Sequence, residues 1–532
     1  MKATEANLLG FLRKPNQFAI PIYQRTYSWL EPECVQLWND IIRAGSNDTI
    51  SGHFIGSIVY IESGQSTVTS PTPLLVIDGQ QRLTTISLIL EALARRVGEG
   101  EPLDGFSARK LREYYLINPL EKGERGYKLL LTQTDKSGLL ALVQQKPLPK
   151  DCSIRIQENF NFFVEKIKSL GNNLVPLCKG LAKLDIVDIS LNRSQDNPQL
   201  IFESMNSTGR KLSQADLIRN YILMGLEPDH QTILYQDHWQ PMELDFGQEA
   251  YGVHFDRFMR HYLTIKTGEI PNIDKVYESF KTFAKPEIDD QGIDVLVADI
   301  HTFSEYYCRI VLGKEKDKDL AEAFKDLVEY KVDVAYPFLL ELYQDYSKKI
   351  LSLNDFLRAL RLVESYVFRR AICNLPPNSL NKTFSTMGRS LRKDTYLESI
   401  QAYFALLPSY RRFPDDDEFK NEIKTRDLYN FPRRSYWLRR IENFGRKERV
   451  AVGEYTIEHI MPQNNDLSSA WRTALGEDWQ RVHETWLHTL GNLTLTGYNS
   501  EYSDRAFTEK RDMKGGFKDS PLKLNEGLGQ ID

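Results

Sequence analysis

Short apolar runs near the N-terminus alternate with turn signals and predict a sheet. QFAIPIYQR and FIGSIVYIES are typical of strands, and PLLVIDGQQ predicts a buried strand that ends at a glycine. A helix is expected from about Leu83 to Val97, and residues 60–73, rich in Ser, Thr and Pro, predict the turn of a long hairpin. KLDIVDISL at 183–191 predicts a further strand. The block 1–225 is therefore expected to be one α/β unit with a helical insert.

Beyond this block the periodicity becomes helical. Residues 226–430 carry Tyr, Phe and Leu at spacings of three and four, which is typical of a helical scaffold. PDDDEF at 414–419 predicts an exposed break or the cap of the next helix, and an arginine-rich helix is expected after it. Because domains usually hold about 100–200 residues, we expect three of them, 1–225, 226–430 and 431–532, in an α+β, largely helical protein.

The composition, 41% hydrophobic and 27% charged, is that of a globular protein. No apolar run reaches the roughly 18 residues of a membrane span, and the first thirty residues do not resemble a signal peptide, so we expect a cytoplasmic protein that contacts no membrane. A formal net charge of −5 gives no general attraction to nucleic acid, so DNA contacts must use a local basic patch. The five cysteines form no CxxC pair and are expected to be reduced: Cys34, Cys152, Cys178, Cys308 and Cys373.

Two segments near the C-terminus, EHIMPQ and GNLTLTGYN, carry residues that suit a one-metal nuclease. A neutral imidazole can take a proton from water because its pKa lies near the operating pH, and we expect His459 to be this general base. A hard divalent cation needs oxygen ligands, which Glu458 and Asn499 offer. Asn492 is expected to hold the backbone around His459 so that the imidazole points at the scissile phosphate.

The spacing of these segments predicts a ββα-metal unit. TIEHI is expected to be a strand that Pro462 ends, NLTLT a second strand, and YNSEYSDRAFTEK the helix that carries Asn499. The alternative is an ordinary surface pair with ordinary turn residues, although turn chemistry does not explain the strand–proline break after His459. His483 and His488 are expected to be packing or surface residues rather than zinc ligands.

Just upstream, PRRSYWLRRIENFGRKER holds seven basic and two acidic residues, with aromatic residues interleaved. Arg433, Arg434, Arg439 and Arg440 are candidate contacts to DNA phosphates. A core helix whose aromatic residues pack while its arginines lie in water explains the pattern equally well.

Polar clusters also interrupt two N-terminal strands, PIYQRTYSW and IDGQQRLTT. The second cluster places a carboxylate, two amides and a guanidinium at the start of a helix, and these groups suit phosphate and metal chemistry. An Asp-Gly pair alone fits a type I′ turn, but such a turn does not require Gln80, Gln81 and Arg82 as well. The sequence has no G-x-x-x-x-G-K-[ST] loop, so nucleotide hydrolysis would have to be non-Walker.

Taken in order, YQRTYSW, FIGSIV, DGQQRLTT, FESMNSTGRKLSQADLIRN, YVFRRAICNLPPNSLNKTF and the two C-terminal segments resemble the GmrSD-type modification-dependent (type IV) restriction enzymes. Over roughly residues 450–515 the chain resembles HNH (His-Me finger) nucleases in which asparagines replace the later histidines. The resemblance implies a ParB-like domain that senses modified DNA or hydrolyses an NTP. It also implies a DNA nuclease that uses Mg²⁺ or Mn²⁺ in defence against phage.

Carried over by position, the resemblance implies a nucleotide- or DNA-sensing site made of Gln24, Arg25, Asp78, Gly79, Gln80, Gln81 and Arg82. Asn206, Gly209, Arg210 and Asp216 are expected to complete the pocket, although Ser213 with Asp216 also fits a helix capping box. GTP or ATP would be the substrate or effector. Double-stranded DNA, specifically modified phage DNA, would be the partner, together with further copies of the chain or other defence proteins.

Two other functions stay open at this point. One is a nucleotide-dependent DNA-binding switch that protects without cutting. The other is a nuclease that attacks RNA or host DNA. Plasmid nicking with a divalent metal separates the first from a restriction enzyme, and substrate competition separates the second.

Overall fold

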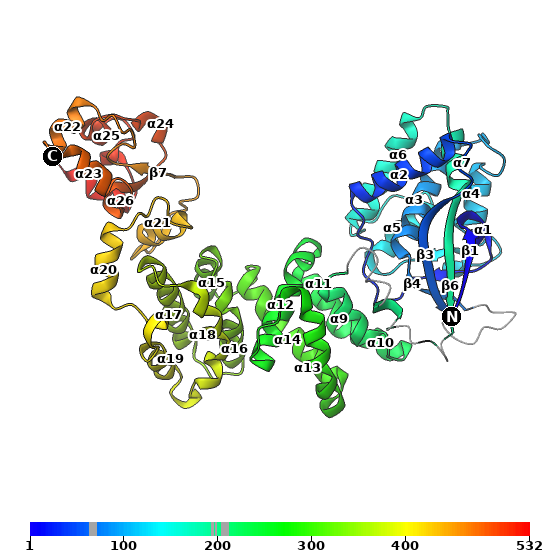
Figure 1. Cartoon of the computed structure of the whole chain (residues 1–532), viewed down its shortest axis with the longest axis horizontal. Coiled ribbons are helices and arrows are strands. Elements are labelled where there is room, and N and C mark those ends of the chain that lie inside the picture. The colour runs from blue at the N-terminus through cyan, green and yellow to red at the C-terminus, as the bar shows by residue number, and fades with distance from the viewer. Residues whose placement is uncertain (63–71, 193–195, 197–198, 200, 204–211, 532) are drawn as a thin grey trace. The chain divides into compact units, whose positions relative to one another are not determined.

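The structure, a computed structural model, describes residues 1–62, 72–192, 196, 199, 201–203 and 212–531. The described chain is α+β and largely helical, as expected (Figure 1). It divides into two compact units, Met1–Pro241 with Asp274–Val297 and Met242–Ile273 with Ala298–Asp532. The expected division into three domains stays a prediction.

The first unit is built on a mixed sheet with strand order β1-β6-β3-β4-β2-β5. The strands are β1 (Lys2–Asn7), β2 (Phe18–Ala19), β3 (His53–Glu62), β4 (Leu74–Asp78), β5 (Leu129–Leu130) and β6 (Leu184–Leu191). β3 is antiparallel to β4 and parallel to β6, and β6 is antiparallel to β1, so these strands lie side by side (Figure 1). The expected strands and the β3–β4 hairpin are confirmed, and residues 63–71 of its turn lie outside the described residues.

The first unit also contains helices. They are α1 (Leu8–Arg13), α2 (Glu31–Ser46), α3 (Gln80–Val97), α4 (Ala108–Tyr115), α5 (Gln133–Val143), α6 (Ile154–Ser169), α7 (Val175–Ala182), α9 (Gln214–Leu223), α10 (Pro228–Leu234) and α13 (Val276–Gln291). Helix α3 begins three residues earlier than expected because Gly79, at φ +99°, ends β4 and caps the helix.

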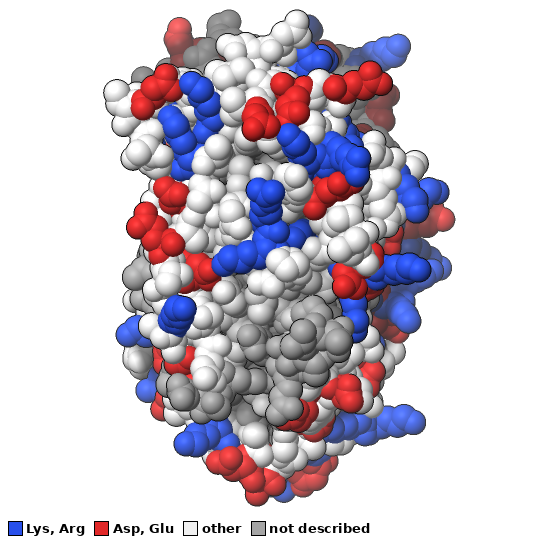
Figure 2. Space-filling view, turned by 90° about the vertical axis from the view of Figure 1, so that its right-hand side faces the viewer, with Lys and Arg blue, Asp and Glu red and all other residues white. Residues whose placement is uncertain are grey.

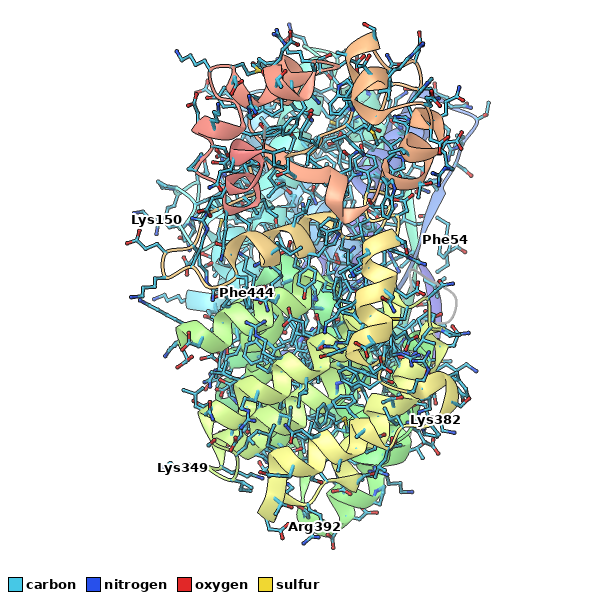
Figure 3. The ribbon with its side chains drawn as sticks, turned by 90° about the vertical axis from the view of Figure 1, so that its left-hand side faces the viewer. Phe54, Lys150, Lys349, Lys382, Arg392 and Phe444 are labelled. Carbon is cyan, nitrogen blue, oxygen red and sulfur yellow. The ribbon has the colours of Figure 1, made fainter. Side chains whose placement is uncertain are left out.

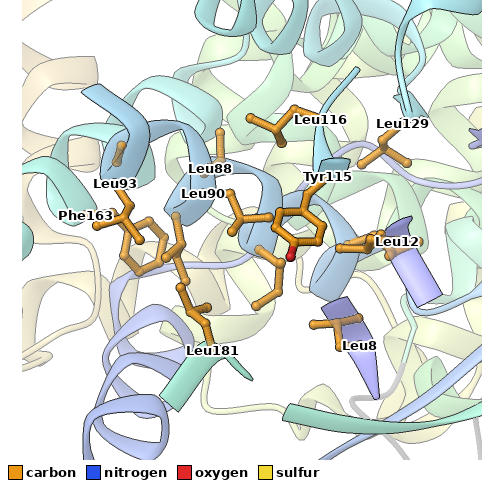
Figure 4. Packing of buried hydrophobic residues seen from close by; sticks show 14 of the residues in the cluster. Leu8, Leu12, Leu88, Leu90, Leu93, Tyr115, Leu116, Leu129, Phe163 and Leu181 are labelled. Atoms are coloured by element: carbon orange, nitrogen blue, oxygen red, sulfur yellow. The ribbon is translucent and has the colours of Figure 1, made fainter. Parts of the chain in front are cut away.

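Helix α3 is the centre of the first core, since every residue from Leu83 to Ala94 is buried. Its leucines pack with Leu8 and Leu12 of α1, Tyr115 of α4 and Phe163 of α6 (Figure 4). Burial of each such side chain contributes about 1.5–3 kcal/mol. A helix that is buried on all sides lies in the interior, and here it fixes the place of the turn at its N-terminus.

The second unit consists mostly of helices. They are α12 (Gln248–Thr267), α15 (Lys318–Glu329), α16 (Tyr336–Ser347), α17 (Leu353–Ile372), α18 (Leu380–Met387), α19 (Tyr396–Ala405), α20 (Asp416–Thr425), α21 (Arg434–Asn443), α22 (Ser469–Leu475), α23 (Trp479–Trp486), α24 (Asn499–Tyr502), α25 (Phe507–Asp512) and α26 (Lys523–Glu526). Helices α11 (Gln240–Phe246) and α14 (Ile293–Val311) cross the boundary between the units. Asp415 caps α20 by accepting from the Glu418 amide at 2.8 Å, so the expected capping role of PDDDEF is confirmed.

Three general expectations can be compared with this fold. All five cysteines are free thiols, as expected. Within the described part of the chain, no helix is both long enough and apolar enough to cross a bilayer. On the face shown in Figure 2, Lys and Arg side chains alternate with Asp and Glu, in keeping with the small net charge.

Candidate active site

Two antiparallel strands carry the C-terminal candidate residues. β7 (Thr456–His459) pairs with β8 (Leu493–Thr496), with Glu458 opposite Thr494 and His459 opposite Leu493. α24 follows β8 and begins at Asn499, so the predicted order of strand, strand and helix is confirmed. The prediction of a single long helix after β8 is wrong, because Ser503, at φ +42°, ends α24 after one turn.

Asn492 joins the segment after β7 to the segment before β8. Its side-chain Oδ1 accepts from the Met461 amide at 2.6 Å. Its Nδ2 donates to the carbonyl oxygens of Met461 at 3.0 Å and Leu487 at 2.8 Å. The buried amide is thus fully used in holding backbone next to His459. This is the contact that the sequence predicted for Asn492.

His459 lies at the end of β7 with only 4% of its surface exposed. Its Nε2 is 3.1 Å from Nδ1 of His488. The Tyr429 ring packs against the His459 ring, with 4.4 Å between centroids and 65° between the ring planes. The His488 ring stacks on Tyr429 at 5.2 Å and 14°. Two aromatic side chains from separate segments, Tyr429 and His488, therefore pack against the expected general base.

Burial is the main cause that lowers the pKa of His459 to about 4, and electrostatic interactions with His488, Lys510 and Arg434 act in the same direction. Only Asp427 opposes them. At neutral pH the imidazole is therefore uncharged and able to accept a proton. His488 was expected to be a packing or surface residue, and its contact with His459 was not predicted.

Glu458 has a different environment, although it precedes His459 directly. Neighbouring side chains of a strand point to opposite faces. Glu458 is 3% exposed, and its Oε1 accepts from Nζ of Lys510 at 2.6 Å. The fully buried Lys510 also donates to the carbonyl oxygens of His459 at 3.1 Å and Ile460 at 3.2 Å. Burial raises the pKa of Glu458 and lowers the pKa of Lys510, while each partner's charge offsets part of the shift.

This arrangement does not fit the expected metal site. The carboxylate of Glu458 is engaged by an ammonium group, and the amide of Asn499 donates from Nδ2 to the Ile457 carbonyl oxygen at 3.2 Å. The structure therefore does not assemble Glu458 and Asn499 as a ligand pair. Nor do the described residues contain any cluster of three His, Cys, Asp or Glu side chains suited to a metal ion.

Carboxylates of the helical scaffold hold two of the four candidate DNA-binding arginines. Arg439 on α21 donates to Asp326 at 2.7 Å and to Glu329 at 2.6 and 2.9 Å, both on α15. Arg440 lies 3.1 Å from Glu364 of α17 and 3.4 Å from Asp326. Asp326 is fully buried, so these ion pairs fasten α21 to the scaffold. The expectation that Arg439 and Arg440 contact phosphate is corrected accordingly.

Arg433 and Arg434 are exposed at the start of α21. The guanidinium of Arg434 lies 4.5 Å from the Tyr429 ring centroid and donates to the Tyr429 carbonyl oxygen at 3.1 Å. Arg433 lies over Tyr330 at 5.4 Å. Arg434 thus brings an exposed positive charge beside the ring that faces His459. At the other end of α21, Phe444 is 79% exposed (Figure 3).

In the first unit, the predicted sensing residues lie together at the end of β4, where buried amides bind backbone. Gln24 donates to the Ile77 carbonyl oxygen at 3.0 Å, and Gln80 donates to that of Arg25 at 3.0 Å. Gln81 accepts from the amides of Ser28 at 2.9 Å and Trp29 at 3.2 Å. The glutamines of YQRTYSW and DGQQR therefore fix the two segments against each other.

Asp78 and Arg82 remain partly exposed at this turn, with 31% and 23% of their side chains accessible. Arg82 pairs with Asp78 at 3.3 Å, and it also donates to the Ser57 carbonyl oxygen. Gly56, at φ +112°, has no side chain in the space beside Arg82; a Cβ there would lie 2.7 Å from the guanidinium. The turn therefore presents one carboxylate and one guanidinium to solvent.

The helix α9 candidates are only partly described. Ser213 and Asp216 form the expected capping box, which is confirmed by hydrogen bonds between each side chain and the other residue's amide. Asn206, Gly209 and Arg210 lie outside the described residues.

Comparison with known proteins identifies both ends of the chain. Residues 8–223 match the family described as GmrSD restriction endonuclease, N-terminal domain. Residues 413–532 match the family described as GmrSD restriction endonucleases, C-terminal domain. A search of curated proteins gives no match. DNA is the partner of such enzymes. Because the two matches together span more than half of the chain in the expected order, the protein belongs to the GmrSD restriction endonuclease family of type IV defence enzymes.

Proposed function

We propose that the protein cuts DNA at an HNH (His-Me finger) unit formed by β7, β8 and α24, with His459 as the general base. The observation that carries this proposal is the placement of His459 at the end of β7, where Asn492 holds the neighbouring backbone and burial lowers the pKa of the imidazole so that it is uncharged at neutral pH. A catalytic base must be unprotonated at the working pH, and this imidazole meets that condition.

In the proposed reaction a water molecule attacks phosphorus and gives its proton to His459, while the bond to the leaving oxygen breaks and that oxygen takes a proton from solvent. Asn492 keeps the backbone beside the base in place through its contacts to Met461 and Leu487. Arg434 is placed to meet the phosphate, because its charge is exposed beside Tyr429. Guanidinium groups pair well with phosphate oxygens.

The predicted Mg²⁺ or Mn²⁺ ligand set does not fit the site, since Glu458 is held by Lys510. We therefore derive no step through a bound metal. Whether cleavage needs a metal can be measured without knowing the ligands, by comparing DNA cleavage with Mg²⁺, with Mn²⁺ and after a chelator is added.

For the first unit we propose a ParB-like sensor in which Asp78 and Arg82 contact a nucleotide, GTP or ATP, or modified phage DNA. The chemistry of the turn supports this proposal, because Asp78 and Arg82 lie at the N-terminus of α3, where backbone amides favour anions. The glutamines shape this turn rather than contact the ligand, because their amides are already used.

The test uses the full chain on matched modified and unmodified plasmids, with and without each NTP and divalent metal. His459→Asn should lose cleavage and keep DNA binding, whereas Asp78→Asn should lose the response to NTP or to modification. His483→Asn is the matched control, because this second buried histidine of the C-terminal region has its Nε2 paired with the Pro462 carbonyl oxygen, 2.9 Å away. Cleavage by His459→Asn at the wild-type rate would refute the assignment of the base.

One observation favours a second function. Glu458 is locked in a buried ion pair, and a nuclease that needs this carboxylate for a metal would be inactive. The alternative is a nucleotide-dependent DNA-binding switch that protects without cutting. It predicts tight, NTP-dependent DNA binding and no nicking under any metal condition in the same assay.

A further inference from the structure

We propose that His488 is a positioning residue for the general base, which accepts a hydrogen bond from Nε2–H of His459 and so leaves Nδ1 of His459 to take the proton from water. This inference rests on the proposed role of His459 as the base. It assigns the tautomer of His459 and names the group that fixes it.

The contact between the two rings carries the argument. Nε2 of His459 and Nδ1 of His488 are 3.1 Å apart, which is a hydrogen-bond distance. A neutral imidazole has one N–H donor and one acceptor nitrogen, so one ring must donate to the other. If His488 donated, both nitrogens of neutral His459 would be occupied, one by its own hydrogen and one by the hydrogen bond. Only donation from His459 leaves it a lone pair for catalysis.

The surroundings of His488 keep its ring in place. Its carbonyl oxygen accepts from the amides of Leu428 at 2.8 Å and Tyr429 at 3.3 Å. Its ring stacks on Tyr429, and the preceding carbonyl oxygen, that of Leu487, accepts from Asn492. A residue whose backbone is hydrogen-bonded and whose ring is stacked loses little conformational entropy when it orients a second ring. His488 thus has the fixed position that a positioning residue needs.

The charges around the pair are consistent with this direction of donation. When Nδ1 of His459 takes a proton, the imidazolium still donates from Nε2 to His488, and the carboxylate of Asp427 stabilises the positive charge. Lys510 and Arg434 oppose it, and they favour return of the proton afterwards. The proton therefore enters at Nδ1 and leaves from the same atom, with no change at His488.

Two substitutions separate positioning from packing. His488→Leu removes the acceptor, while His488→Asn offers an amide oxygen close to the place of Nδ1. We expect kcat of the leucine variant to fall about ten- to a hundredfold with KM nearly unchanged, because orientation rather than binding is lost. The asparagine variant should recover most of this loss. His483→Leu, on helix α23 of the same domain, is the control for general packing damage.

The tautomer is read separately by ¹⁵N NMR of histidine side chains in the full chain at neutral pH. We expect His459 to carry its hydrogen on Nε2 in the wild type and in His488→Asn, and a mixture of tautomers in His488→Leu. A hydrogen on Nδ1 of His459 in the wild type overturns the proposal, as does an equal loss of kcat in His488→Leu and His483→Leu. Because the NMR measurement needs no cleavage, it can fail or succeed separately from the test of His459 as the general base.

Discussion

Removal of the buried ammonium of Lys510 gives the sharpest test of how the active-site strand is held. Lys510→Met leaves the carboxylate of Glu458, 3% exposed, without its ammonium partner, and it removes the hydrogen bonds that Lys510 donates to the carbonyl oxygens of His459 and Ile460. Breaking a buried ion pair from one side costs roughly 3–5 kcal/mol. Since 1.4 kcal/mol is a factor of ten, the opening of this region should become at least about a hundredfold more frequent.

Hydrogen exchange of the full chain, read on peptides that cover β7, measures this opening locally. We expect these amides to exchange faster in Lys510→Met, and kcat to fall because the backbone that carries His459 is no longer fixed. Lys518→Met is the matched control, since its ammonium is 52% exposed and pairs with an exposed carboxylate, Asp512. That variant should exchange like the wild type, because exposed ion pairs stabilise little.

The double variant Glu458→Leu with Lys510→Met should regain most of the lost protection, because an apolar pair can replace a buried ion pair. Unchanged exchange in Lys510→Met would contradict the reasoning, for it would mean that the pair does not hold the strand. A normally stable Glu458→Gln that needs more Mg²⁺ or Mn²⁺ for cleavage would show instead that this carboxylate binds a metal.

Three further predictions follow from the two sites. As the pH is lowered, kcat/KM should fall near pH 4 rather than near pH 6.5, because His459 stays neutral until the pH reaches its lowered pKa. A fall near pH 6.5 would contradict this effect of burial. Arg434→Ala should weaken DNA binding and reduce the salt dependence by about one phosphate contact, whereas Arg481→Ala, 77% exposed on α23, should change neither. Gln81→Ala should lower the stability of the first unit by about 1–3 kcal/mol in thermal unfolding, while Asp78→Asn should alter only the response to ligand.

The sequence predicted local structure well because local structure follows from hydrophobic periodicity. The strands β7 and β8, the capping box at Ser213 and the arginine helix α21 all appear where the pattern indicated. Asn492 was also assigned to the backbone near His459, since an asparagine between two short strands has few other roles.

Contacts between distant segments could not be predicted in this way. Lys510 lies 52 residues from Glu458, and His488 lies 29 residues from His459, so no spacing rule connects them. In a sequence, a buried lysine cannot be distinguished from a surface lysine unless its partner is known. The same holds for Arg439, whose carboxylate partners on α15 lie more than a hundred residues away.

The central claim is that His459 takes the proton in DNA cleavage, and a single-turnover measurement tests it most directly. Full-length wild type and His459→Asn are each mixed in excess with labelled DNA that the wild type cuts, and the rate of strand cleavage is followed. We predict equal DNA binding and a rate at least about a hundredfold lower for His459→Asn, which is the usual contribution of a general base. Equal cleavage rates in the two proteins would contradict the account.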